Sequence, residues 1–199
     1  MEIILIRHFK TKGNMEKRYI GVTDEPLYMD GDFRTFLRQK QKKVPNADMV
    51  VASPMRRCVQ TAKLLYPKAA PLLLSNFKEC DFGLFEYKNY EELKNNPDYQ
   101  KWLDSGGTIP FPGGEAHEDF LKRSRDTFDW MVMMLMEKKI DRAALIVHGG
   151  TIMSILSGFS PTKCDFYQWQ VENGDGFRVM LDDEEWKQGK KRFREIQKL

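Results

Sequence analysis

Short apolar runs, each bounded by turn-forming residues, recur along the chain and predict five β-strands. The runs are Ile3 to Ile6, Met49 to Ala52, Pro71 to Leu74, Ala143 to Val147 and Phe177 to Leu181. Uninterrupted runs of this length are typical of strands that are buried on both faces. The segments between them are long enough for helices, and strands joined through helices pair in parallel. We therefore expect an α/β fold, a three-layer α/β/α sandwich around a largely parallel central sheet.

Three helical patterns lie between the predicted strands. One covers Gly31 to Lys43, and another begins at Ser53-Pro54, where serine suits the cap and proline the first turn, and continues through Leu65. The third runs from Glu115 to Lys139 and carries an apolar residue at every third or fourth position. It places His117 at an exposed helix start, and we assign this histidine no catalytic role.

Size and composition indicate a water-soluble globular protein with a single domain, residues 1–199. We find no linker, repeat or low-complexity segment, and the fractions of charged (31%) and hydrophobic (41%) residues are ordinary. No apolar run approaches the roughly 20 residues that span a bilayer, so we expect no membrane association. Three cysteines, an odd number without metal-ligand spacing, suggest reduced thiols rather than a disulfide framework. We therefore expect a cytoplasmic location.

The net charge of +3 is too small to indicate a nucleic-acid-binding protein. One local exception is the basic tail from Lys187 to Leu199. We interpret it as a solvated terminal helix, with a docking surface for an acidic partner as the alternative.

Residues suited to binding an anion follow three of the predicted strands. Arg7-His8 follows the first, Arg56-Arg57 the second, and His148-Gly149-Gly150 the fourth. In open α/β sheets ligands bind outside the carboxyl ends of the strands, and helix N-termini there offer unpaired N–H groups. Each segment alone fits a polar strand end equally well. Parallel pairing would bring all three to one edge of the sheet.

A fourth segment, residues 77–86, embeds acidic residues among aromatic ones. A carboxyl group in such surroundings is desolvated, which favours its protonated form and suits it to general-acid catalysis. Glu79 and Asp81 are the candidates. The alternative is a loop whose aromatic side chains cover the core while its acids face water.

In this order the motifs resemble those of the histidine phosphatase superfamily, which has the phosphoglycerate-mutase-like fold. The opening pattern appears as Arg7-His8 with Asn14, and Ser53-Pro54-Met55-Arg56-Arg57 is similar to the second motif, whose arginine falls at Arg57. The remaining matches are Glu79 to Glu86, Gly113-Gly114-Glu115 with Arg123, and His148-Gly149-Gly150-Thr151. Two positions depart from the pattern: Phe9 and Tyr87 stand where glycine is common. We expect both near the pocket, where they would affect the choice of substrate.

The resemblance implies a phosphomonoester hydrolase that acts on a small phosphorylated metabolite through a phosphohistidine on His8. Arg7, Arg57 and a protonated His148 would surround the phosphoryl group, with Asn14 and Gly149 as further hydrogen-bond donors. Glu79 would protonate the leaving oxygen and then activate water, with Asp81 as the alternative acid. Neither a metal nor another cofactor is implied, because these side chains supply the positive charge.

Several alternatives remain open at this stage. A phosphoglycerate-mutase-type phosphotransferase would use the same residues, and the chain's length favours hydrolysis. The length also resembles that of α-ribazole phosphatases, and an apolar wall for an aromatic leaving group could come from Phe77, Phe82, Phe85, Tyr87 and Tyr90. Lys10 and Lys12 could bind a second acidic group. A non-catalytic phospholigand-binding protein is the remaining alternative, and the oligomeric state cannot be predicted.

Overall fold

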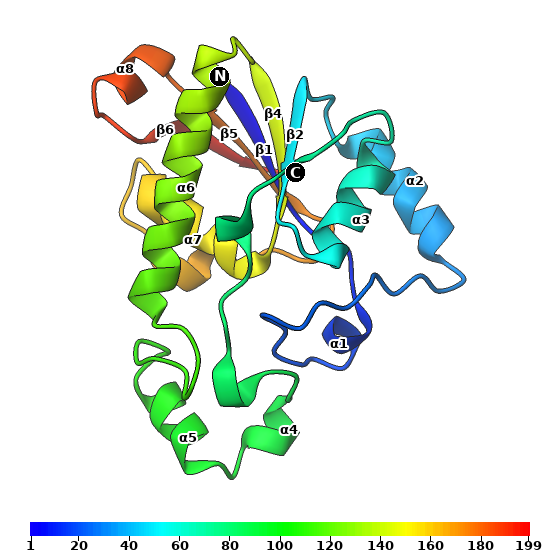
Figure 1. Ribbon diagram of the computed structural model, residues 1–199, viewed down its shortest axis with the longest axis vertical. Coiled ribbons are helices and arrows are strands. Elements are labelled where there is room, and N and C mark those ends of the chain that lie inside the picture. The colour runs from blue at the N-terminus through cyan, green and yellow to red at the C-terminus, as the bar shows by residue number, and fades with distance from the viewer.

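The computed structural model describes residues 1–199 and contains one six-stranded sheet (Figure 1). The strands are ordered β3-β2-β4-β1-β5-β6, and β1 to β4 pair in parallel, whereas β5 is antiparallel to both of its neighbours. Their bounds are β1 Glu2–Arg7, β2 Met49–Ala52, β3 Leu72–Leu73, β4 Arg142–Val147, β5 Gly176–Leu181 and β6 Phe193–Lys198. The predicted α/β class with a largely parallel sheet is therefore confirmed.

Helices cover both faces of this sheet. In Figure 1, α2 (Phe33–Lys43) and α3 (Arg56–Leu65) lie on one side of the strands, and α6 (His117–Glu137) and α7 (Gly149–Phe159) lie on the other. The shorter helices are α1 Lys12–Met15, α4 Tyr90–Leu93, α5 Pro97–Asp104 and α8 Asp183–Lys187, with 3₁₀ turns η1 Ser75–Phe77, η2 Gly83–Phe85 and η3 Phe166–Trp169. None of the helices is both long and apolar enough to span a membrane.

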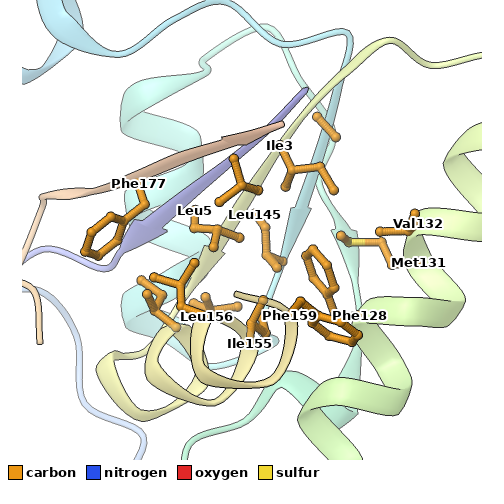
Figure 2. Close-up of a cluster of buried hydrophobic side chains, with 14 of the residues drawn as sticks. Ile3, Leu5, Phe128, Met131, Val132, Leu145, Ile155, Leu156, Phe159 and Phe177 are labelled. Atoms are coloured by element: carbon orange, nitrogen blue, oxygen red, sulfur yellow. The ribbon is translucent and has the colours of Figure 1, made fainter. Parts of the chain in front are cut away.

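Alternation along β1 divides the core between the two helical layers. Ile3 and Leu5 belong to the larger cluster with Phe128 of α6 and Ile155 of α7, as Figure 2 shows. Ile4 and Ile6 point to the opposite face, because successive side chains of a strand alternate, and join the cluster under α3. Burial on both faces explains why β1 is an unbroken apolar run.

The helix predicted to begin at Ser53-Pro54 begins two residues after Pro54, at Arg56. Met55 occupies the N-cap position and makes no side-chain capping bond. The hydroxyl of Ser53 instead lies 2.8 Å from Nε2 of His148, so the serine belongs to the contacts at the strand ends.

The expected terminal helix is wrong: the tail forms the end of α8 and the edge strand β6. Phe193 is buried against the core, and β6 pairs antiparallel with β5. Arg194 pairs with Asp182, and Lys191 with Asp129, so part of the basic charge is compensated within the chain. Charged side chains on an edge strand also discourage pairing with other chains.

The carboxyl ends of the parallel strands face the part of the molecule that contains α1, α4 and α5 (Figure 1). The segment between β3 and α6 extends beyond this edge of the sheet, with α4 and α5 farthest from the strands. A cavity at these strand ends is lined by residues of the strand ends, such as His8, and of this segment, such as Glu79.

Candidate active site

His8 and His148 face one another at the ends of two neighbouring strands. Arg7 pairs with Val147 in the β1–β4 register, so the residues that follow are also adjacent, and the backbone N–H of His8 donates to Val147 O at 2.9 Å. The two imidazole rings meet edge to face with 5.3 Å between their centroids. Parallel pairing thus produces the predicted convergence.

One ring nitrogen of His8 is fixed by the backbone. Nδ1 lies 2.7 Å from Phe9 O and, since a carbonyl only accepts, it carries the proton. The lone pair of a neutral imidazole is then on Nε2. The side chain is 4% exposed, and burial, followed by the charges of Arg57 and Arg7, holds its pKa well below the usual range. The structure therefore favours a neutral His8 imidazole whose Nε2 is unprotonated.

Arg7 lies beside His8 on the wall of a cavity of about 610 Å³. Its Nη1 donates to Val171 O at 2.7 Å, and its buried Nε has no acceptor in the protein. Gly149, the first residue of α7, packs against it: a Cβ there would lie 3.3 Å from Nε of Arg7. The guanidinium and the start of α7 together offer N–H donors to an anion.

Arg57 and His148 lie behind His8 and do not line the cavity. Nε of Arg57 donates to Nδ1 of His148 at 3.3 Å, while its terminal nitrogens donate to Thr23 O and Gly21 O at 2.7 and 2.8 Å. A ring nitrogen that accepts carries no proton, so His148 is neutral and donates from Nε2 to Ser53. Its pKa is lowered well below the usual range by burial and then by Arg57 and His8. The expectation of a protonated His148 does not hold without a bound anion.

Glu79 reaches the same cavity from the loop after η1. Its carboxyl accepts the backbone N–H groups of Gly150 at 3.0 Å and Cys80 at 3.1 Å. Burial raises its pKa despite these hydrogen bonds and the charges of Arg57 and Arg7, which act in the opposite direction. A raised pKa favours the protonated form of this carboxyl, and that form is suited to general-acid catalysis.

Asp81, the alternative acid, does not line the cavity. Its Oδ1 accepts from the backbone N–H of Gly83 at 2.8 Å and so stabilises the turn at η2. The geometry therefore distinguishes the two carboxyl groups that the sequence left open.

Asn14 lines the cavity next to His8. It occupies a short helix capped by Thr11, and its Oδ1 accepts from Thr11 N and from Nδ2 of Asn173, both at 3.2 Å. Because the oxygen is occupied, the amide nitrogen of Asn14 is the group left to donate to a ligand. Asn173, whose Nδ2 also donates to His8 O, was not identified from the sequence.

Comparison with known proteins agrees with this geometry. The sequence profile of the Histidine phosphatase superfamily (branch 1) matches residues 3–191. The chain belongs to this superfamily. The chain is also 24% identical to the Bacillus subtilis (strain 168) protein "Uncharacterized phosphatase PhoE" over 188 residues, which cover 93% of this chain and 91% of the relative. That name agrees with the prediction of a phosphomonoesterase.

Two solved structures share the superfamily fold. A phosphoglycerate mutase from Thermus thermophilus is 26% identical and has a TM-score of 0.67, with 100% of this chain and 99% of that chain covered. The α-ribazole phosphatase from Shigella flexneri is 17% identical with a TM-score of 0.77, and coverage is 92% and 91%. At that identity the second likeness shows the fold alone.

The two departures from the superfamily pattern lie outside the cavity. Phe9 is fully buried and packs edge to face against Phe33 and Phe36 of α2. Tyr87 has a φ of 59°, in the left-handed region that glycine adopts most easily, which explains why glycine is common there. Neither side chain lines the cavity, although Phe9 adjoins it through the hydrogen bond between its carbonyl and Nδ1 of His8.

The apolar wall of the cavity differs from the one predicted. Of the five predicted aromatic residues only Phe82 lines it; Phe77 and Phe85 are core residues, and Tyr87 and Tyr90 lie on the surface. The actual aromatic lining is Tyr19, Phe82, Trp102, Phe111, Phe120, Phe166 and Tyr167. Most of these residues stand in no recognisable motif, so only the folded loops reveal them.

The charged and titratable residues at this wall also differ from expectation. Lys10 and Lys12 are exposed and do not line the cavity, whereas Arg18 and Lys198 do. His117 begins α6 as predicted, but it is half-buried, lines the cavity and contacts Phe166 edge to face at 4.9 Å.

Arg123 holds the segment that carries Glu79. From α6 it donates to the backbone oxygens of Asn76, Lys78 and Glu79 at 2.7, 2.8 and 3.0 Å, and to both oxygens of Glu115 at 2.6 and 2.8 Å. Five donors in a planar fork leave the loop little freedom. The sequence resemblance included this arginine, but only the structure shows what it contacts.

Proposed function

We propose that this protein hydrolyses phosphomonoesters through a covalent phosphohistidine at His8. The observation that carries the proposal is the hydrogen bond from Nδ1 of His8 to Phe9 O, which leaves Nε2 unprotonated at the end of a cavity lined by Arg7 and Glu79. A buried neutral imidazole beside a fixed cation is suited to attack on phosphorus. The substrate is then a small phosphorylated molecule.

In the first step Nε2 of His8 attacks phosphorus, and the bond between phosphorus and the ester oxygen breaks. The protonated carboxyl of Glu79 donates its proton to that oxygen, so the leaving group departs as a neutral alcohol. In the second step the Glu79 carboxylate takes a proton from water, and the water oxygen attacks phosphorus. The N–P bond breaks, and phosphate leaves the regenerated imidazole.

Positive charge and N–H donors stabilise the phosphoryl oxygens during both steps. Arg7, the amide of Asn14 and the start of α7 at Gly149 lie at the cavity wall. Arg57 and His148 contribute from behind His8, where Arg57 lowers the pKa of both histidines. A phosphoryl dianion placed at this wall would favour protonation of His148 and make it a further donor. The reaction proposed here uses no metal ion.

The decisive experiment measures hydrolysis of para-nitrophenyl phosphate in the presence of a chelator. We expect turnover by the native chain and none by His8→Ala above background. Rapid acid-free quenching with radiolabelled substrate should trap label on His8, as an alkali-stable and acid-labile adduct. Turnover by His8→Ala equal to that of the native chain would contradict the proposal.

Phosphoglycerate mutation is the second candidate, because the same residues serve a reaction in which a bound sugar acid replaces water as acceptor. The Thermus relative named a phosphoglycerate mutase favours testing it. Isomerised phosphoglycerate in place of free phosphate would identify the mutase, and release of phosphate from α-ribazole phosphate would identify that specific hydrolase.

We further propose that residues 1–199 act as one catalytic domain in the cytoplasm. Residues from both halves of the chain meet at one site, as His8, Glu79 and His148 do. The three cysteines are free thiols, as is usual in a reducing compartment. Cell fractionation with an antibody against the chain tests the location.

A further inference from the structure

The cavity continues from His8 into a space walled by aromatic rings. These rings form the aromatic chamber, defined here as Tyr19, Phe82, Trp102, Phe111, Phe166 and Tyr167. Neighbouring rings contact one another: the centroids of Phe82 and Phe111 are 5.0 Å apart, and those of Trp102 and Phe111 are 5.1 Å apart. A phosphomonoester held at His8 would therefore extend its leaving group toward these rings.

With the exception of Lys198, the cationic groups beside the aromatic chamber are compensated or neutral. Arg18 donates to the carboxylates of Glu16 and Glu92 at 2.6 and 2.7 Å, so two acids already balance its charge. Burial and the charge of Arg125 lower the pKa of His117 and keep it neutral near pH 7. Glu172 adds an acid to the same cavity. Away from the phosphate end, Lys198 is the only cation of the cavity that forms no ion pair. Its side chain is exposed at the end of β6.

The tyrosines of the chamber contribute ring surface to its wall. The hydroxyl of Tyr19 is already bonded to that of Tyr99, at 2.9 Å. Gly107, with a φ of 76°, lies between Tyr167 and Trp102: a Cβ there would be 2.5 Å from the Tyr167 hydroxyl and 3.2 Å from Cζ2 of Trp102. The missing side chain keeps these two rings close together at the cavity wall.

We propose that the aromatic chamber binds the leaving group of the substrate, and that this group is an uncharged aromatic ring system rather than a short acidic chain. The inference rests on the proposed function, because it takes His8 as the site of phosphoryl transfer. A planar ring can stack on or meet the chamber's rings edge to face. A carboxylate would lose water there, and the exposed Lys198 at the end of β6 is the only unpaired cation that it could gain in return.

Three phosphate esters with similarly acidic leaving groups separate ring size from charge. Phenyl phosphate is the reference, naphthyl phosphate adds a second uncharged ring, and para-carboxyphenyl phosphate adds a carboxylate to the same single ring. We expect kcat/KM for naphthyl phosphate to exceed that for phenyl phosphate about tenfold. We expect kcat/KM for para-carboxyphenyl phosphate to be about tenfold lower than that for phenyl phosphate.

Tyr167→Ser tests the chamber with little risk to folding, because this side chain is 47% exposed. Its matched control is Tyr90→Ser, since Tyr90 is 56% exposed and lies outside the cavity. Tyr167→Ser should lower kcat/KM for naphthyl phosphate about tenfold and change that for phenyl phosphate less than threefold. Tyr90→Ser should leave both kcat/KM values unchanged. Tyr167→Lys should raise kcat/KM for para-carboxyphenyl phosphate relative to that for phenyl phosphate.

The results distinguish this inference from the proposed function. Equal kcat/KM values for naphthyl and para-carboxyphenyl phosphate would overturn the inference but not the proposed function. The same holds if Tyr167→Ser lowers kcat/KM equally for phenyl and naphthyl phosphate. If no ester is hydrolysed above the His8→Ala level, the proposed function fails. In that case calorimetry with benzylphosphonate and naphthylmethylphosphonate tests the ligand preference of the aromatic chamber separately. Tighter binding of naphthylmethylphosphonate supports the inference, and equal binding overturns it.

Discussion

The carboxyl of Glu79 is bound to the first turn of α7 through the backbone N–H of Gly150, at 3.0 Å. The loop that supplies the acid is thereby tied to the strand end that supplies His148, although the two segments are far apart in the sequence. Gly150 is required for this contact, because a Cβ there would lie 2.5 Å from Oε1 of Glu79.

Gly150→Ala should therefore displace Glu79 and lower kcat about a hundredfold, the scale expected for a shift of about 1 Å in a catalytic group. The fold should persist, because alanine favours a helix more than glycine does. Gly158→Ala on the same helix is the control: its Cβ would meet the flexible side chain of Arg125. Steady-state kinetics and thermal unfolding of both variants check the prediction, and equal kcat values would contradict it.

The pH dependence of kcat/KM should be bell-shaped, because the reaction needs neutral His8 and protonated Glu79. Activity rises as pH increases through the pKa of His8, which is lowered, so the acid limb lies below the usual histidine range. Activity falls as pH increases through the pKa of Glu79, which is raised, so the basic limb lies above the usual range for glutamate. The measurement is a pH series with phenyl phosphate.

Glu79→Gln should abolish the basic limb and lower kcat for an alkyl phosphate by about 10² to 10⁴. A nitrophenyl ester has a leaving group that needs no acid. For this ester the substitution should instead slow the hydrolysis of phosphohistidine. Stopped-flow kinetics should then show a burst of nitrophenol followed by slow turnover. A loss of equal size for both esters, without a burst, contradicts the assignment.

Stability should fall on acidification because His8 and His148 are buried in the neutral form. Their folded-state pKa values are lowered, so below the usual value of 6.5 the unfolded chain binds more protons than the folded one. Between pH 7.5 and 5.5 each contributes a loss on the order of 1 kcal/mol in the free energy of unfolding. Glu79, whose pKa is raised, acts in the opposite direction as the pH falls.

His148→Asn tests this origin of the pH dependence. The variant should lose on the order of 1 kcal/mol less than the native chain over the same interval. Urea unfolding at the two pH values supplies the comparison. An unchanged pH dependence would show that His148 titrates alike in both states.

Arg123→Lys should lower kcat about tenfold with little change in KM, because lysine cannot hold the three backbone oxygens around Glu79 and the Glu115 carboxylate together. As a positioning residue Arg123 should also influence the basic limb of the pH profile, which follows Glu79. Arg125→Lys is the control, since Arg125 donates to Ser154 O and to Ser157, away from the site. Equal effects of the two substitutions would indicate general loosening of α6.

Tyr87→Gly should raise the free energy of unfolding by about 1 kcal/mol, because it relieves a left-handed conformation that is unfavourable for tyrosine. Tyr90→Gly, in the first turn of α4, should instead lower it by a similar amount. Urea unfolding measures both. A decrease in Tyr87→Gly would mean that the ring's contact with Arg18, at 5.2 Å, outweighs the strain.

The sequence was informative where local patterns determine structure. Each of the predicted strands matches within one residue at either end, because each is an apolar run bounded by turn-forming residues. The residues that follow β1 and β4 are likewise placed by strand pairing alone. β6 was missed because an edge strand needs only part of its surface buried, so its charges resembled a solvated helix.

The aromatic chamber could not be predicted for a different reason. Trp102 and Tyr167 come from segments far apart in the sequence, and their meeting depends on Gly107 leaving room for both rings. The density of aromatic residues near Glu79 predicted Phe77 and Phe85 as part of the cavity wall, but both are buried in the hydrophobic core. Local density therefore identified the loop but not its exposed side chains.

Part of the β3–α6 segment can change without altering the residues proposed for phosphoryl transfer. Phe82, Trp102, Gly107 and Phe111 all lie within residues 82–111 of that segment, after Glu79, whereas His8 and His148 are anchored on the sheet. Substrate preference can therefore drift, or be redesigned by exchanging residues 82–111, while the phosphoryl-transfer machinery is inherited unchanged. A library of variants confined to residues 82–111 should yield enzymes that accept different leaving groups while they catalyse the same reaction.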